Sequence, residues 1–304
     1  MVYEWGTVMT AFDIRHVLDI KAGLGEAPLW SQEQEALYWL DQRGKTLNRF
    51  DPVSGKNIAW PVEGRPGSFT FCPGGVLIAA NLGFFRFDFA NETLDLVCDP
   101  PFDPNHFRFN DGKADRQGRF WVGSMLAEFK HDDEGEGQGI YYRYDAGKLI
   151  PGITGIHVPN GTAFSPDGTI MYRAESMQRI VFAHDYDPLT GTPSNERIIA
   201  EMPDGFGIPD GGTVDSEGGL WLAVPFGETG KVARFTPDGQ LDLHFDVPVL
   251  APSMVAFGGA DMATLFITTG RIEALMDRPL SPLGGDLFAV ETGFRGIPEA
   301  ITQL

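Results

Sequence analysis

The chain has 304 residues, of which 42% are hydrophobic and 12% aromatic, and it contains 38 glycines and 22 prolines. This composition is typical of a globular protein rich in strands and turns, and it excludes a disordered or collagen-like chain. The formal net charge of −19 would repel a nucleic-acid backbone and an anionic membrane surface, so we expect neither as a partner.

The cysteines and the N-terminus bear on the compartment. Cys72 and Cys98 have neither the spacing of a zinc site nor the number needed for a disulfide framework. The N-terminus lacks the basic and apolar regions of a signal peptide, and no run of about 18 apolar residues occurs. We therefore expect a cytoplasmic protein. We expect one domain over residues 1–304, with residues 1–11 a loose extension and translation starting at Met1 or Met9.

In chain order, a strand-like segment over residues 12–20 comes first and belongs to no repeat. Six similar units follow. Each has a polar residue near Gly or Pro, an apolar strand, a turn rich in Gly, Asp or Pro, an aromatic-aliphatic strand and two more polar strands. The units are spaced by roughly 42 to 50 residues, the length of a propeller blade. They begin at Glu26, Ser68, Asn110, Asn160, Asp210 and Ser253.

Alternation of apolar and polar residues dominates each unit, as in LYWLD, RFWVG and LWLAV, with turns such as SPDG, DSEGG and TPDG between strands. No amphipathic helix of ten or more residues is evident. The pattern predicts an all-β fold, a six-bladed β-propeller with four antiparallel strands per blade. Because residues 12–20 have no blade of their own, we expect them to close the ring as the outer strand of the last blade, which removes an exposed sheet edge.

The first residue of each unit enters the strand that lines the central channel, so these six side chains should converge on one axis. Glu26, Asn160 and Asp210 supply carboxylate and amide oxygens, which hard divalent cations prefer as ligands. Any one Asn-Gly or Asp-Gly is a common turn dipeptide. The prediction of a metal site therefore depends on these residues occupying the same position in their repeat units. The sequence thus predicts a metal site with Glu26, Asn160 and Asp210 as ligands.

Four stretches in this order, GLGEAPLW with LYWLD, RFNDGKADRQGRFWVGSM, PNGTAFSPDG and IPDGGTVDSEGGLWLAV, resemble the senescence marker protein/regucalcin/gluconolactonase family of six-bladed propellers. The likeness runs from about Leu24 to Gly293. It implies one divalent metal on the three predicted ligands, with calcium expected and zinc, manganese, magnesium or iron left open. It also implies that Asp210 is the catalytic general base.

The resemblance further implies three substrate-binding residues. Arg108 and Asn110 resemble the pair that bonds sugar hydroxyls, and Glu128 falls at the spacing of another substrate contact. Glu175 departs from the family pattern, which often has Asp there. The insert at residues 131–139, within the loop 129–139, is predicted to shape the channel mouth.

The resemblance implies a hydrolase that opens a small sugar lactone, and a monomer is our default expectation. In this hypothesis water deprotonated by Asp210 attacks the lactone carbonyl, while the metal stabilises the oxyanion. One alternative is a phosphotriesterase or arylesterase, in which Asn110 would ligate the metal directly. The other is a non-enzymatic calcium-binding regulatory protein of regucalcin type. The presence of Arg108 and Asn110 favours a substrate over cation storage.

Overall fold

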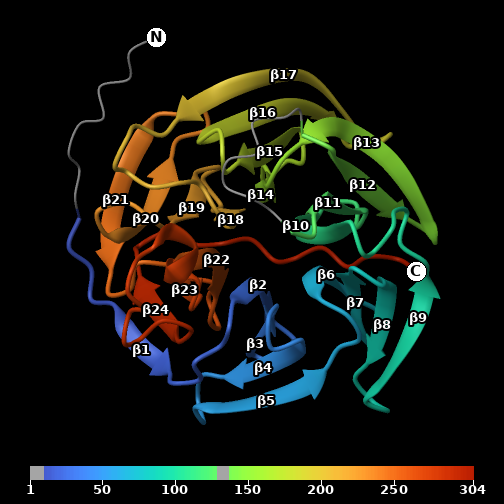
Figure 1. Ribbon diagram of the computed structural model, residues 1–304, viewed down its shortest axis with the longest axis horizontal. Coiled ribbons are helices and arrows are strands. Elements are labelled where there is room, and N and C mark those ends of the chain that lie inside the picture. Colours follow the sequence, from blue (N-terminus) through green and yellow to red (C-terminus); the bar gives the residue numbers. More distant parts are fainter. Residues whose placement is uncertain (1–9, 129–136) are drawn as a thin grey trace.

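The computed structural model describes residues 10–128 and 137–304. Its strands form six four-stranded antiparallel sheets, arranged as blades around a central axis (Figure 1). Over the described ranges there is no α-helix, and one 3₁₀ turn, η1, spans Glu273–Met276. The six-bladed β-propeller predicted from the repeats is confirmed. No helix in this part of the chain is long and apolar enough to cross a membrane.

Each blade has an inner strand, two middle strands and an outer strand. The inner strands are β2 (Gly25–Ser31), β6 (Pro66–Cys72), β10 (Phe107–Ala114), β14 (Pro159–Phe164), β18 (Gly212–Val214) and β22 (Pro252–Gly258). Next come β3 (Ala36–Asp41), β7 (Gly75–Ala80), β11 (Phe120–Leu126), β15 (Ile170–Glu175), β19 (Leu220–Val224) and β23 (Thr264–Thr269). The third strands are β4 (Thr46–Asp51), β8 (Gly83–Asp88), β12 (Gly139–Asp145), β16 (Ile180–Asp187), β20 (Gly230–Phe235) and β24 (Leu287–Glu291). The outer strands are β5 (Lys56–Pro61), β9 (Thr93–Cys98), β13 (Lys148–Ile156), β17 (Thr192–Glu201), β21 (Leu241–Val247) and β1 (Arg15–Leu18).

The ring closes through β1, which pairs antiparallel with β24 so that Arg15 faces Ala289. The N-terminal strand is therefore the outer strand of the sixth blade, as predicted. Ahead of it, the Thr10 amide donates to the His244 carbonyl at 3.1 Å. Residues 1–9, most of the predicted extension, lie outside the described residues.

Buried aromatic side chains join neighbouring blades. Trp121 of the third blade packs edge-on against Tyr186 of the fourth, with ring centroids 6.2 Å apart, and donates to its hydroxyl at 2.8 Å. Trp221 of the fifth blade meets Phe257 of the sixth at 5.7 Å. An aromatic side chain buries about 150–250 Å² of surface, so these contacts contribute strongly to blade packing.

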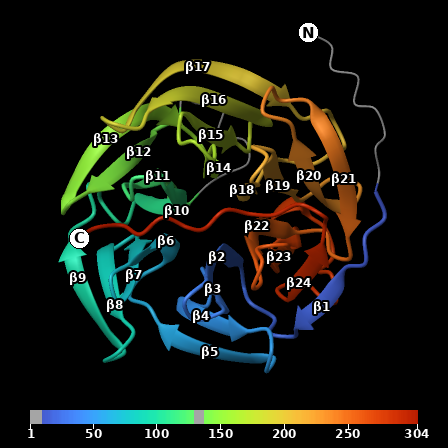
Figure 2. The same cartoon turned by 180° about the vertical axis from the view of Figure 1, so that it is seen from behind.

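After β24 the chain crosses the ring from the sixth blade to the second, as the red segment of Figures 1 and 2 shows. We call residues 292–304 the C-terminal tail. The tail bonds the segments at the ends of inner strands: Ser216 donates to the Arg295 carbonyl at 2.7 Å, and Thr302 donates to the Phe71 carbonyl at 2.8 Å. It lies across one end of the channel, which we call the far end. The near end is where the inner strands begin.

Candidate functional site

A cavity of about 360 Å³ lies at the near end and is lined by residues from all six blades. All six side chains predicted to hold metal or substrate line it: Glu26, Arg108, Asn110, Glu128, Asn160 and Asp210. The other two unit-starting residues do not. Ser68 donates to the Gly112 carbonyl at 2.8 Å, and Ser253 contacts Thr268 at 3.0 Å. These serines join strands near the channel.

Irregular backbone at the starts of inner strands helps to aim the site residues into the cavity. The pairing register shifts between Glu26 and Leu29 in β2, and between Asn160 and Ala163 in β14. The residues that follow the two predicted ligands, Ala27 and Gly161, have positive φ values of 49° and 59°. Glycine adopts this conformation freely, whereas alanine there costs roughly 1–2 kcal/mol. Bulges of this kind re-aim side chains and are frequent next to active sites.

Buried carboxylates of the first and fifth blades line the cavity. Glu26 and Asp210 are each 9% exposed. Burial, and then the neighbouring Asp210 and Asp111, raises the pKa of Glu26 well above its usual range. Burial and Asp111 raise the pKa of Asp210 likewise. No cationic group of the described residues pairs with Glu26 or Asp210 within 4.0 Å. The charge of Arg108 partly offsets that of Glu26, but neither carboxylate has an ion-pair partner among the described residues.

A chain of hydrogen bonds fixes the two amides. Arg108 Nη1 donates to Asn110 Oδ1 at 2.6 Å, and Asn110 Nδ2 donates to Asn160 Oδ1 at 3.0 Å. Asn160 Nδ2 donates in turn to Ser176 Oγ at 2.7 Å, and Ser176 donates to the Pro209 carbonyl. Because Ser176 takes the amino group of Asn160, the amide oxygen of Asn160 turns toward Asn110, on the cavity side.

The donor set fits a hard divalent cation. Two buried carboxylates and one oriented amide oxygen are oxygen ligands of the kind that calcium and magnesium prefer. In residues 10–128 and 137–304 no three His, Cys, Asp or Glu side chains form a metal cluster. The predicted set does not need one, since its third oxygen comes from Asn160. A bound cation would also offset the repulsion that raises the two carboxyl pKa values.

Several residues around the cavity were not singled out from the sequence. Asp111 accepts the backbone amides of Gly112 and Thr162 at 2.8 and 2.7 Å, so it holds the third and fourth blades together beside the carboxylates. Arg43 and Arg65 line the cavity from the loops before β4 and β6. Only Asp111 had a signal in the sequence, because it belongs to the RFND motif.

Glu175, at a position where the family often has Asp, has a structural role. Its carboxylate accepts the amides of His157 and Val158 at 2.9 and 2.6 Å and so anchors the segment that leads to Asn160. The insert predicted to shape the channel mouth lies outside the described residues as far as residue 136.

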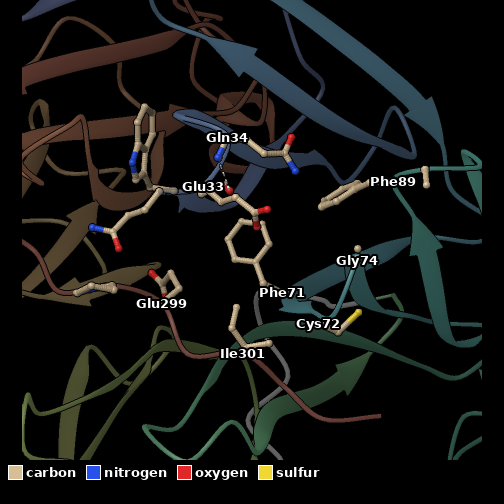
Figure 3. A pocket seen from close by; sticks show the side chains of 14 residues that line it. Glu33, Gln34, Phe71, Cys72, Gly74, Phe89, Glu299 and Ile301 are labelled. Carbon is tan, nitrogen blue, oxygen red and sulfur yellow. Dashed lines mark hydrogen bonds between the residues drawn. The ribbon is translucent and has the colours of Figure 1, made fainter.

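A second pocket, of about 580 Å³, lies at the far end between the first two blades and the tail. Figure 3 shows the side chains of Glu33, Phe71 and Ile301 around it. None of the predicted site residues lines this pocket. One of its carboxylates, Glu299, pairs with Lys113 at 2.6 Å. The smaller cavity at the near end is therefore the candidate site.

Known proteins share this sequence and fold. The sequence description "SMP-30/Gluconolactonase/LRE-like region" matches residues 24–271. A 6-deoxy-6-sulfogluconolactonase of Pseudomonas putida is 34% identical, covering 91% of this chain and 94% of that protein. A pentonolactonase of Haloferax volcanii is 32% identical, covering 94% and 97%. The crystal structure of a calcium-binding regucalcin from Agrobacterium tumefaciens has a TM-score of 0.88 at 26% identity, covering 98% of this chain and all of that one. The chain therefore belongs to the SMP-30/gluconolactonase/LRE-like family.

Proposed function

We propose that this protein is a divalent-metal-dependent sugar lactonase whose active site is the cavity at the near end. The observation that carries the proposal is the pair of buried carboxylates, Glu26 and Asp210, which have no ion-pair partner among the described residues and lie beside the oriented amide of Asn160. A cavity of about 360 Å³ suits a small molecule such as a monosaccharide lactone. Relatives named as a sulfogluconolactonase and a pentonolactonase support the same reaction class.

Glu26, Asn160 and Asp210 would hold the metal, and calcium is the ion we propose because the donors are all oxygens. When bound, the ion supplies Lewis acidity that stabilises negative charge on the lactone carbonyl oxygen. A calcium-binding protein of the same fold, the Agrobacterium tumefaciens regucalcin, supports this choice.

The side chains of this protein supply the remaining steps. The Asp210 carboxylate takes the proton of the attacking water, the role of a general base. Arg108 Nε is buried and has no hydrogen-bond partner in the described part of the chain, so it can donate to a sugar oxygen. Asn110 and the exposed carboxylate of Glu128 provide further polar contacts for sugar hydroxyls.

The amide of Asn110 bears on the phosphotriesterase alternative, in which it would ligate the metal. Its oxygen already accepts from Arg108 at 2.6 Å, and its amino group donates to Asn160 at 3.0 Å. Each amide oxygen keeps a second lone pair, so these hydrogen bonds do not prevent ligation. The bond from Arg108 places Asn110 beside a residue proposed to bind the sugar and supports the same role for Asn110.

The test is acid release, followed with a pH indicator, from aldono-1,4- and 1,5-lactones and from paraoxon by metal-stripped protein with each divalent ion restored. We expect lactone hydrolysis that calcium restores. Glu26→Gln should lower kcat/KM by more than the roughly 10–100-fold that losing an outer-shell partner costs. The matched control, Glu33→Gln in the far-end pocket, should keep wild-type activity. Turnover of paraoxon alone, or calcium binding without any turnover, would contradict the proposal.

A further inference from the structure

Three arginines, Arg43, Arg65 and Arg108, line the near-end cavity. None of their guanidinium groups lies within 4.0 Å of a carboxylate of any described residue, Glu26 and Glu128 included. The chain has 42 acidic residues and only 23 Lys and Arg, so most arginines could find a carboxylate partner. Three arginines at one cavity, each without a carboxylate partner in residues 10–128 and 137–304, therefore form a candidate site for an anionic ligand.

Arg65 is held in place without being neutralised. Its Nε and Nη2 atoms both donate to Gln42 Oε1, at 3.1 and 2.8 Å. Gln42 is 1% exposed, and the Arg65 backbone amide is fixed by Asn81 Oδ1 at 2.7 Å. A neutral amide orients the guanidinium but leaves its charge intact. The remaining nitrogen, Nη1, makes no hydrogen bond to the described residues and is available to an anion.

The three guanidinium groups are close enough to repel one another. Burial, and then the charge of Arg65, lowers the pKa of Arg108 to about 9; Glu26 opposes this shift and Arg43 adds to it. Burial and then Arg43 lower the pKa of Arg65, and Glu26 again opposes the shift. Arg43 is exposed, Arg65 is half-buried and Arg108 is 9% exposed, so the positive charges run from the mouth of the cavity inward. A bound anion would relieve this repulsion, and Arg is the side chain best suited to bind sulfonate, phosphate or carboxylate oxygens in pairs.

The cavity is thus lined by two buried carboxylates, Glu26 and Asp210, and by the guanidinium groups of Arg43, Arg65 and Arg108. The charge of Glu26 partly offsets those of Arg65 and Arg108. We infer that the preferred substrate is a sugar lactone whose carbon chain ends in an anionic group, which Arg43 and Arg65 bind while the lactone ring lies toward Glu26 and Asp210. This inference rests on the proposed lactonase function. It adds that the substrate is charged and names the residues that select it.

The test compares kcat/KM on glucono-1,5-lactone with kcat/KM on the same ring carrying a sulfonate or phosphate at carbon 6, and on a glucarolactone, which has a carboxylate there. We expect at least one anionic lactone to be preferred by about 10–100-fold, the size of one or two charge-assisted hydrogen bonds. The arm with the highest ratio identifies the anion. Equal kcat/KM on neutral and anionic lactones would overturn the inference and leave the lactonase proposal standing.

Substitutions then test which residues cause the preference for anionic lactones. Arg65→Gln should lower the anionic-to-neutral ratio about tenfold, and Arg43→Gln/Arg65→Gln should abolish the preference. Arg65→Lys keeps the charge and should retain part of it. The control is Arg197→Gln, which removes an arginine that pairs with Asp185 at 2.8 Å on the outer edge of the fourth blade. A preference unchanged in the double variant would overturn the assignment to these two residues.

A binding measurement separates failure of this inference from failure of the proposed function. Calorimetry with the open-chain acids gluconate and 6-phosphogluconate requires no turnover. We expect the phosphorylated acid to bind at least about tenfold more tightly, and the difference to vanish in the double variant. If no lactone is hydrolysed but this difference is present, the anion site stands and the lactonase proposal fails. Equal affinities that do not depend on Arg65 would contradict the anion site.

Discussion

At the near end of the channel Glu26 and Asp210 are buried without a cationic partner among the described residues, whereas at the far end Lys113 and Glu299 lie 2.6 Å apart. The far end is also covered by the C-terminal tail, whose backbone bonds the segments that end the inner strands. One end of the same six inner strands therefore has buried carboxylates without an ion-pair partner among the described residues, and at the other end Lys113 is paired with Glu299.

The two ends of the channel show that buried charges without an ion-pair partner identify the site better than pocket volume does. The far-end pocket is the larger, at about 580 Å³ against about 360 Å³, yet it contains none of the predicted ligands. Unpaired buried charges destabilise a fold, so a protein retains them where a ligand or reaction uses them. The near-end carboxylates meet that criterion, while the paired residues at the far end serve stability.

The largest effect we predict is on catalysis at the near end. Asp210→Asn removes the proposed base and one negative charge while keeping the shape of the side chain. We expect kcat on a sugar lactone to fall by about 10²–10⁴-fold, the usual contribution of a general base. Stopped-flow acid release at saturating metal measures it, and calorimetry of calcium binding separates loss of metal from loss of the base.

The control for Asp210→Asn lies on the same blade. Asp215 is fully buried beyond the other end of β18, where it accepts from Trp221 Nε1 and Arg234 Nε at 2.7 Å each. Asp215→Asn should lower stability while the folded fraction keeps its kcat. Full activity in Asp210→Asn with metal bound would show that Asp210 is not the base.

The second prediction concerns the far end and is smaller. Glu299→Leu leaves the Lys113 ammonium, 6% exposed, without its carboxylate partner. We expect the free energy of unfolding to fall by roughly 3 kcal/mol, the lower end of the range for breaking a buried pair. Urea denaturation measures this change, and kcat per folded molecule should stay at the wild-type value.

A double variant keeps the far-end prediction testable if Glu299→Leu folds poorly. Lys113→Met/Glu299→Leu replaces the whole pair with apolar groups and should recover most of the lost stability. The exposed pair of Arg197 and Asp185 is the matched comparison, and Asp185→Asn should cost less than about 1 kcal/mol. Equal losses at the two pairs would mean that the tail does not bury Lys113 and Glu299 effectively.

The fold and the convergence of the site residues could be predicted from the sequence because both follow from the repeat. Period-two alternation and turn residues locate the strands, and a shared register places Glu26, Asn160 and Asp210 at one end of the channel. The strand that closes the ring could be predicted because residues 12–20 belong to none of the six units. The lactonase assignment needed the family resemblance, since periodicity says nothing about the reaction.

Features outside the repeat could not be predicted. Arg43 and Arg65 lie in loops that have no common register between blades, so nothing in the sequence indicates that they reach the cavity. The C-terminal tail crosses the channel through backbone hydrogen bonds, which leave no pattern in side chains. The bulge after Glu26 depends on a positive φ at Ala27, a residue with no turn preference.

The third prediction concerns the pH dependence of stability in metal-free protein. Burial raises the folded-state pKa of Glu26 and Asp210, so as pH rises the unfolded chain releases these protons first. The free energy of unfolding should therefore decline from the ordinary carboxyl pKa range up through the raised folded values. For each carboxyl the decline is about 1.4 kcal/mol per pH unit between its unfolded and folded pKa values. Urea denaturation of chelator-treated protein between pH 4 and 8 measures the slope.

Glu26→Gln should flatten this slope, because one of the two titrating groups is gone. The difference between variant and wild type cancels the contributions of other groups, such as Asp286, whose burial raises its pKa but whose hydrogen bonds to Lys21 and Ile20 lower it overall. Saturating calcium should flatten the wild-type curve in the same way, since a bound cation favours the charged carboxylates. Parallel curves for wild type and Glu26→Gln without metal would mean that Glu26 is already compensated, and the contrast between the two ends of the channel would be lost.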